Sequence, residues 1–255
     1  MRDLTSFTSW NAAWSELRIA VLGLGATGFS AADTLSELKT GVLVIADSAS
    51  AKRVEMAQVI GATLALGGVP ESQVSALQEH EPDVVIVSPG YPLDHPLVEW
   101  CRANSVAMWT EIELAWRLRD KTGTPAEWIA ITGTNGKTTT AQLTAHILST
   151  AGYRAGAVGN IGIPVLDAIR YPDGFDFLVV ELSSFQLHGM PRDGAGAISP
   201  LASVCLNFAD DHLDWHGSRD AYAQAKGTVY ANTKIAAVYN RAVSETQTMV
   251  EEADV

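Results

Sequence analysis

The chain has 255 residues, of which 29 are acidic and 17 are basic, so its formal net charge is −12. Hydrophobic residues make up 47% of the sequence and charged residues 18%, which is typical of a folded protein and excludes a disordered one. The acidic balance, with no run of Lys and Arg, argues against a nucleic-acid partner. No apolar stretch approaches membrane-spanning length and residues 1–16 lack a signal peptide's apolar centre, so we expect no membrane partner and a cytoplasmic location.

The first part of the chain alternates apolar runs with segments of helical periodicity. This alternation predicts an α/β fold with a parallel, doubly wound sheet, whose ligand sites lie at the carboxyl ends of the strands. The expected strands are 17–22, 42–47, 62–66, 83–88 and 106–109, and the expected helices are 27–38, 51–60, 71–80 and 95–104.

A glycine-rich turn, residues 23–28, follows the first expected strand, and Asp47 closes the second. Gly23 would permit the tight turn, Gly25 would let a ligand approach the backbone, and Gly28 would allow close packing of helix on strand. The pattern favours a nucleotide, either NAD with Asp47 on a ribose hydroxyl or another nucleotide such as a uridine diphosphate. A glycine-rich turn without a ligand is the alternative.

A polar, turn-rich segment at residues 119–125 is a plausible linker between two domains. We therefore expect one domain over residues 1–122 and a second α/β domain over residues 123–255.

The second domain opens with the layout of a phosphate-binding loop. An apolar run at 128–131 breaks into a Gly-Thr-Asn-Gly turn, and Lys137, three threonines and a helix-like stretch at 141–149 follow. Lys137 would neutralise the β- and γ-phosphates of a nucleotide, and the Thr138 hydroxyl could bind Mg²⁺. An ordinary turn before a helix is the alternative. The expected phosphate-binding residues are Gly133, Thr134, Asn135, Gly136, Lys137, Thr138 and Thr139.

Three further strand ends in this domain carry polar side chains. Asn160 follows the expected strand 154–158. It either places its side-chain amide beside the loop or belongs to a plain turn. Glu181 interrupts the apolar run 175–182, where a carboxylate suits a Mg²⁺ ligand, although an exposed strand terminus would also accommodate it.

The last part of the chain offers weaker signals. The expected strand 201–207 opens into an acidic loop around His212, which is either a metal or substrate site or a hydrated loop. Composition alone makes Lys226 a solvated lysine on a helix, and we assign His216 a structural role. A further strand is expected at 235–239 and a helix at 241–253.

Together these segments resemble the muramyl ligases, the ATP-dependent amino-acid-adding enzymes of peptidoglycan precursor synthesis. The stretch Glu-Leu-Ser-Ser-Phe-Gln-Leu at 181–187 discriminates best among the members, and the resemblance covers essentially the whole chain. The segments that carry it are 23–28, 88–90, 132–139, 159–162, 181–187, 207–214 and 225–226.

The resemblance implies two Rossmann-like domains, the first binding a UDP substrate and the second, a P-loop domain truncated at its C-terminus, binding ATP. It implies that ATP phosphorylates the carboxylate of UDP-N-acetylmuramoyl-L-alanine, and that the amine of D-glutamate then displaces phosphate. The resemblance implies ATP and Mg²⁺ as cofactors. It implies the two small-molecule substrates, UDP-N-acetylmuramoyl-L-alanine and D-glutamate, as the only partners, and we expect a monomer. Little covalent chemistry falls to the protein, so positioning and charge neutralisation would carry the acceleration.

The resemblance also assigns roles to single residues. Lys137, Glu181, His212 and Lys226 would be catalytic, and the metal ligands would be Thr138, Glu181, His212 and Lys226, the last as a carbamate. The substrate-binding residues would be Ala26, Thr27, Asp47, Ser48, Gly90, Asn160, Ser183 and His212.

The family's C-terminal domain and the rest of its central domain find no counterpart before the last residue, Val255. We therefore expect a fragment with little or no activity alone. Two alternatives stay open: an NAD-dependent oxidoreductase, suggested by the first glycine pattern, and a non-catalytic module that binds UDP-sugars.

Overall fold

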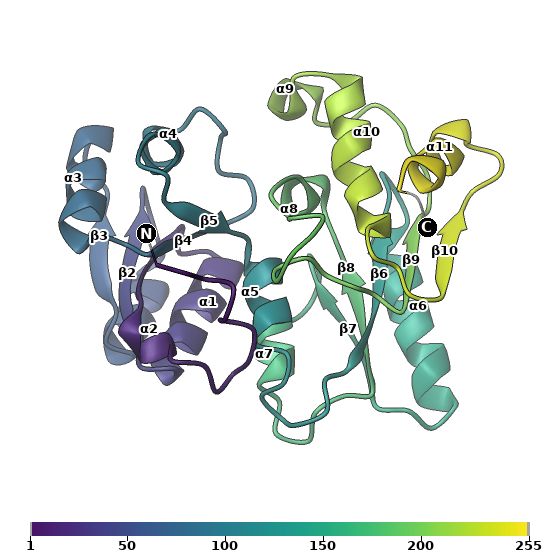
Figure 1. Ribbon diagram of the computed structural model, residues 1–255, viewed down its shortest axis with the longest axis horizontal. Helices are drawn as coiled ribbons and strands as arrows, with labels where there is room; N and C mark the ends of the chain where they lie inside the picture. The colour runs from purple at the N-terminus through teal and green to yellow at the C-terminus, as the bar shows by residue number, and fades with distance from the viewer. Residues whose placement is uncertain (1, 254–255) are drawn as a thin grey trace. The chain divides into compact units, whose positions relative to one another are not determined.

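The computed structural model describes residues 2–253, so Val255, on which the expectation of a fragment rests, lies outside the described part (Figure 1). Contacts divide the chain into two compact units, Met1–Leu114 and Ala115–Val255. The division falls inside helix α5 (Glu111–Arg117), before the linker predicted at 119–125. Trp116 explains this position, because it packs edge-on against Trp128 of the second unit, with ring centroids 5.1 Å apart.

The first unit contains a five-stranded parallel sheet in the order β3-β2-β1-β4-β5. The order reverses between β1 and β4, which is the doubly wound arrangement that the sequence predicts. The strands are β1 (Arg18–Leu22), β2 (Gly41–Ala46), β3 (Thr63–Leu66), β4 (Val84–Val87) and β5 (Ala107–Trp109). The helices are η1 (Trp14–Glu16), α1 (Ala26–Glu37), α2 (Ala51–Val59), α3 (Pro70–His80) and α4 (Pro96–Ala103).

Close packing of α1 on β1 depends on a glycine. A Cβ atom at Gly28 would lie 2.1 Å from the carbonyl oxygen of Gly23, far inside van der Waals contact. The start of α1 can therefore approach the end of β1, as the glycine pattern predicts. Apolar side chains from the central strands and from α3 and α4, including Leu22, Ile45 and Leu77, form the core of this unit.

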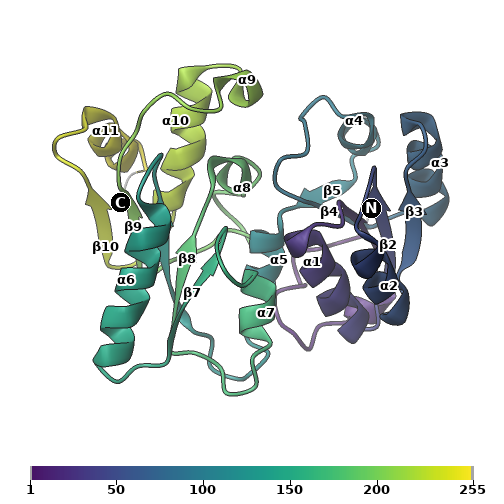
Figure 2. The same ribbon diagram turned by 180° about the vertical axis from the view of Figure 1, so that it is seen from behind.

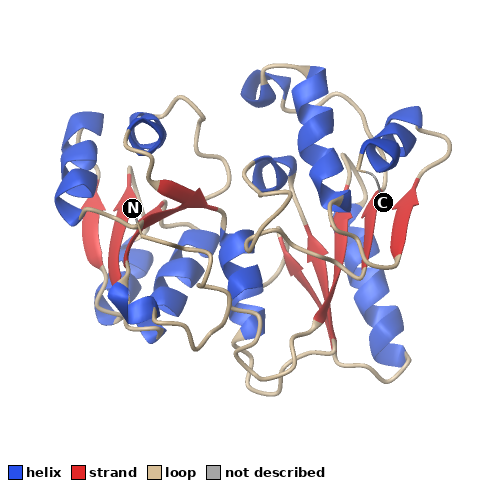
Figure 3. Cartoon of the chain, in the orientation of Figure 1, coloured by secondary structure: helices blue, strands red, loops and turns tan. Residues whose placement is uncertain are grey.

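The second unit contains another five-stranded parallel sheet, in the order β10-β9-β6-β8-β7. The strands are drawn as red arrows in Figure 3. Together the two parallel sheets confirm the predicted α/β fold class. The strands are β6 (Glu127–Thr132), β7 (Ala155–Gly159), β8 (Phe177–Glu181), β9 (Ala202–Cys205) and β10 (Ala236–Tyr239). The helices are α6 (Lys137–Thr150), α7 (Val165–Ile169), α8 (Ser184–His188), α9 (Leu213–His216), α10 (Arg219–Gly227), η2 (Thr228–Tyr230) and α11 (Ser244–Glu252).

Helix α6 begins at Lys137, whereas the sequence predicts its start at residue 141. Gly136 is the reason: it is the N-cap residue with φ of 81°, a left-handed conformation that glycine adopts without strain. The turn into the helix is therefore complete before Lys137, and the threonines that follow belong to the first turns. The helix packs against β7 and β8 and lies in front of the sheet in Figure 2.

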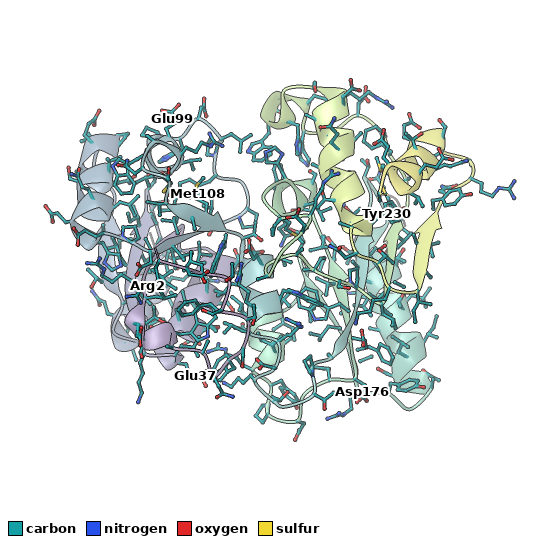
Figure 4. The ribbon with its side chains drawn as sticks, viewed as in Figure 1. Arg2, Glu37, Glu99, Met108, Asp176 and Tyr230 are labelled. Atoms are coloured by element: carbon teal, nitrogen blue, oxygen red, sulfur yellow. The ribbon has the colours of Figure 1, made fainter. Side chains whose placement is uncertain are left out.

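Tyr230, labelled in Figure 4, joins two strands at this sheet's edge. Its buried hydroxyl accepts a hydrogen bond from the Cys205 amide at 2.8 Å and donates one to the Val238 carbonyl at 2.7 Å. Within residues 2–253, no helix combines the length and the apolar character that crossing a membrane requires.

Candidate functional site

The loop between β6 and α6 lies at the carboxyl end of the second sheet. Asn135, Gly136 and Thr138 are exposed there, and α6 points its N-terminus at the loop. The N–H groups of a helix's first turn have no carbonyl partner within the helix, so this end of α6 can receive an anion. The predicted loop is therefore present, with its helix starting one turn earlier than expected.

Two lysines meet at the carbonyl oxygen of Gly133. The ammonium group of Lys137 donates to it at 3.0 Å and also to the Thr134 carbonyl at 3.0 Å. The Lys226 ammonium group donates to the same Gly133 oxygen at 2.9 Å, although Lys226 lies on α10, far along the sequence. Two positive side chains on one carbonyl make this end of the sheet favourable for a negatively charged ligand.

Lys226 is not the solvated lysine that composition suggests, since it is only 2% exposed. Burial lowers its pKa from 10.5 to about 8, while the charge of Lys137 acts in the same direction and Cys205 and Asp211 oppose it. The ammonium group also lies over the ring of Tyr222, 4.8 Å from its centroid. A larger fraction of Lys226 is thus neutral at pH 7 than of an exposed lysine.

Glu181 ends β8 as a buried carboxylate, 2% exposed, and both of its oxygens accept hydrogen bonds from neutral donors. The Thr138 hydroxyl donates to Oε2 at 2.8 Å, and the Asn160 amide donates to Oε1 at 3.1 Å. The Asn160 backbone N–H also donates to the Glu181 carbonyl at 2.9 Å. Carboxylate and hydroxyl oxygens side by side are the ligands that Mg²⁺ prefers, so these residues fit the predicted metal.

A pocket of about 130 Å³ opens beside the loop. Its walls come from the loop and the start of α6, from Asn160 just beyond β7, from the start of α8, from the segment between β9 and α9, and from α10, so residues far apart in the sequence meet there. Six of the predicted site residues line it: Thr134, Lys137, Asn160, Ser183, His212 and Lys226.

Ser183 and His212 line the pocket and also make contacts within the protein. The Ser183 hydroxyl caps α8, where it accepts from the Gln186 amide while the Gln186 side chain binds back to the Ser183 backbone. His212 adopts a left-handed conformation, with φ of 51°, and its Nε2 lies 3.5 Å from the Asp211 carboxylate. No cluster of three His, Cys, Asp or Glu side chains suited to a metal occurs among residues 2–253.

Sequence analysis did not single out Ser184, Phe185 and Tyr222, which also line the pocket. The Ser184 hydroxyl lies 3.0 Å from Nε2 of His216, and the Phe185 ring stacks on the His216 ring at 5.8 Å. Ser184 and Phe185 belong to the stretch 181–187 that carries the family resemblance, which is a sequence signal that could have suggested them.

In the first unit, the predicted nucleotide residues lie at the ends of β1, β2 and β4. Gln73 donates to the Asp47 carboxylate at 2.9 Å, and Asp47 itself is exposed. Burial, followed by the charge of Asp47, raises the pKa of the Tyr91 hydroxyl to about 12, so Tyr91 lies close enough to sense that charge. Ala26, Thr27, Ser48 and Gly90 are exposed or half-buried.

The Mur ligase middle domain matches residues 131–255. UDP-N-acetylmuramoylalanine–D-glutamate ligase of Leifsonia xyli is 54% identical over 99% of this chain and 50% of its own length. The enzyme of the same name from Tropheryma whipplei is 46% identical over 99% of this chain and 52% of its own length. The chain belongs to the Mur ligase family. It spans about half the length of the curated Mur ligases that it matches.

Solved Mur ligase structures share the fold. UDP-N-acetylmuramate:L-alanyl-gamma-D-glutamyl-meso-diaminopimelate ligase from Neisseria meningitides has a TM-score of 0.60 at 18% identity, over 92% of this chain and 75% of its own. UDP-N-acetylmuramate–alanine ligase from Thermotoga maritima has a TM-score of 0.54 at 21% identity, over 91% of this chain and 51% of its own. At these identities the likeness concerns the architecture alone.

Proposed function

We propose that this chain carries the UDP-substrate site and the ATP site of a ligase that joins D-glutamate to UDP-N-acetylmuramoyl-L-alanine. One observation carries the proposal: Lys137, Thr138, Glu181 and Lys226 meet around one loop, although they come from three separate places in the sequence. The relatives described above bear this activity in their names, which favours a ligase over the oxidoreductase alternative.

Each residue around the loop would have a distinct task. The N-terminus of α6 would hold the phosphates of ATP, and Lys137 would leave the loop carbonyls to neutralise them. Thr138 and Glu181 would hold Mg²⁺, which shields the phosphate charges when it is bound. Asn160 would keep the Glu181 carboxylate in place through its amide donor.

Lys226 is suited to the role that the family resemblance assigns to it. The neutral amine is the nucleophile that reacts with CO₂, and burial favours that form. The resulting carbamate would replace donors by carboxylate oxygens able to bind a metal. His212 and Ser183, in the same pocket, would contact the muramyl part of the substrate.

The reaction would proceed in two steps. The carboxylate of UDP-N-acetylmuramoyl-L-alanine would attack the γ-phosphorus of ATP and release ADP, which leaves an acyl phosphate. The amine of D-glutamate would then attack the acyl carbon, expel phosphate and form the amide. The pocket residues would act by positioning these groups and neutralising their charge.

Calorimetry of this chain with three ligands tests the proposal: UDP-N-acetylmuramoyl-L-alanine, a non-hydrolysable ATP analogue with Mg²⁺, and NADH. We expect the first two to bind and NADH not to bind. Preferential binding of NADH would overturn the ligase in favour of the oxidoreductase. Binding of the UDP ligand without the ATP analogue would instead favour the non-catalytic module.

A further inference from the structure

Asn207, directly beyond β9, forms a two-way pair with the phosphate-binding loop. Its Oδ1 accepts from the Asn135 N–H at 2.9 Å, and its Nδ2 donates to the Asn135 carbonyl at 2.9 Å. The carbonyl of Asn207 accepts a third bond from the Thr134 N–H at 3.1 Å. One residue outside the loop thus binds the backbone of two consecutive loop residues.

This pairing prolongs the contact between β6 and β9 beyond the ends of both strands. The Leu206 N–H donates to the Thr132 carbonyl at 3.0 Å, immediately before the Asn207 contacts begin. The Thr134 hydroxyl accepts from the Ala209 N–H at 3.1 Å and donates to the Ala209 carbonyl at 3.2 Å. Because parallel neighbours end at the same edge of a sheet, residues 206–209 run alongside the loop.

The loop therefore divides into two parts. Thr134 and Asn135 donate their N–H groups to residue 207, so these two groups are already hydrogen-bonded within the protein. The N–H groups of Lys137, Thr138 and Thr139, at the start of α6, have no carbonyl partner within the helix and remain available to an anion, whereas the Thr140 N–H already donates to the Gly136 carbonyl. Fixing the first part sets the direction in which the second part points.

We propose that Asn207 is a positioning residue, which holds the loop in its triphosphate-binding shape before the nucleotide arrives. The inference rests on the proposed function, because it takes the loop ligand to be a nucleoside triphosphate. An amide suits the task because it offers one acceptor and one donor in a plane, which match the N–H and C=O of a single residue. A loop that is already ordered loses less conformational entropy on binding.

The decisive variant is Asn207→Ala, and Asn240→Ala is its matched control. Asn240 also ends a strand of this sheet and makes two side-chain bonds, to the Leu206 carbonyl at 3.1 Å and from the Ala242 N–H at 3.0 Å. Neither of these bonds touches residues 133–139. Both variants lose two side-chain hydrogen bonds, but only Asn207→Ala removes bonds to the loop.

Two measurements on the whole chain test the inference: affinity for Mg²⁺ with a non-hydrolysable ATP analogue, and amide hydrogen exchange at Thr134 and Asn135 without ligand. For Asn207→Ala we expect roughly tenfold weaker binding, the equivalent of about one ordinary hydrogen bond, together with faster exchange at Asn135, whose N–H loses its acceptor. Asn240→Ala should keep the wild-type affinity. Unchanged binding by Asn207→Ala, or an equal loss in both variants, would overturn the inference while leaving the proposed function intact. A wild-type chain that fails to bind the analogue would refute the nucleotide loop and the inference together.

Asn207→Asp supplies a test that does not depend on how well the alanine variant folds. The ionised aspartate can accept from the Asn135 N–H, but it places a lone pair against the Asn135 carbonyl, so binding at pH 7 should be weaker than in the wild type. Binding of the ATP analogue by Asn207→Asp that is as tight at pH 7 as binding by the wild type would contradict a positioning role for the amide.

Discussion

Glu181 should determine how strongly Mg²⁺ affects binding of the ATP analogue. Glu181→Gln keeps the shape and the contacts with Thr138 and Asn160 but removes the charge that would balance Mg²⁺. We expect Mg²⁺ to strengthen binding of the ATP analogue in the wild type, and roughly 10- to 100-fold of that gain to disappear in the variant, as for a lost charged contact. Calorimetry with Mg²⁺ and with EDTA measures the difference.

Glu127→Gln is the control for the loss of a carboxylate from the same sheet. Glu127 begins β6, pairs with Lys234 at 2.8 Å and is half-exposed, away from the loop. This variant should respond to Mg²⁺ like the wild type. If Glu181→Gln also kept the full response, the Mg²⁺ assignment of Glu181 would be wrong.

His216 should make the stability of the fold depend on pH. Burial, helped by the charges of His188, His212 and Lys226, lowers its pKa from 6.5 to about 4. Between these two values the unfolded chain binds more protons than the folded one, so stability is present above pH 6.5 and is lost as the pH falls toward 4. At pH 5 the expected loss is on the order of 2 kcal/mol.

Urea unfolding at pH 7 and pH 5 checks this expectation by comparing variants. His216→Gln should show a smaller loss of unfolding free energy between the two pH values than the wild type. His146→Gln changes an exposed histidine on α6 and should leave the wild-type loss unchanged. Equal pH dependence in all three chains would show that His216 titrates normally.

At the scale of elements, two glycines in the turn between β1 and α1 should have different roles, Gly28 in packing and Gly25 in the approach of a ligand. Gly28→Ala would place a Cβ 2.1 Å from the Gly23 carbonyl, whereas a Cβ at Gly25 meets nothing within 4 Å. We expect Gly28→Ala to lower the unfolding free energy by about 1–3 kcal/mol or more, as overpacking does. Gly25→Ala should cost less stability and instead weaken the UDP ligand, because its methyl group would face the crevice.

Thermal unfolding and binding of UDP-N-acetylmuramoyl-L-alanine distinguish the two effects. If Gly25→Ala bound the UDP ligand as tightly as the wild type, close approach of a ligand to this turn would be excluded. If Gly28→Ala kept the wild-type melting temperature, the backbone at Gly23 would have to be free to move.

The sequence predicts the strands well because buried parallel strands are continuous apolar runs, such as 19–22 and 178–180. It misses the short helices α8 and α9, which span only one or two turns and whose starts depend on local contacts. Ser183 and Gln186 form a capping box, and His212 precedes α9 in a left-handed conformation. Periodicity cannot detect helices that span little more than one repeat.

The features of the site likewise fall into those that the sequence predicts and those that it does not. Lys137, Thr138 and Glu181 could be predicted because each lies at or just beyond the end of a strand in a recognisable local pattern. The pairing of Asn207 with Asn135, and the burial of Lys226 against Gly133, depend on which strands become neighbours. No single segment of the sequence determines the strand order of a parallel sheet, so these contacts could be identified only from the structure.

At the scale of the whole molecule, the two units each place a glycine-rich turn and a helix N-terminus at the carboxyl end of a parallel sheet. The first unit offers an exposed carboxylate, Asp47, beside its turn, which suits the hydroxyl groups of a ribose. The second offers Lys137 and Lys226, which suit phosphate charge. From the different chemistry of the two turns we expect two different ligands rather than two copies of one.

Replacing a single residue in one unit should therefore weaken the binding of one ligand and leave the binding of the other unchanged. Lys137→Ala should weaken the ATP analogue roughly 10- to 100-fold, the loss expected for a charged hydrogen bond, and spare UDP-N-acetylmuramoyl-L-alanine. Asp47→Ala should weaken the UDP ligand and spare the analogue, because Asp47 contacts Gln73 of its own unit. Calorimetry of both variants with both ligands gives four affinities. Equal losses for both ligands in either variant would mean that the two turns serve a single ligand site.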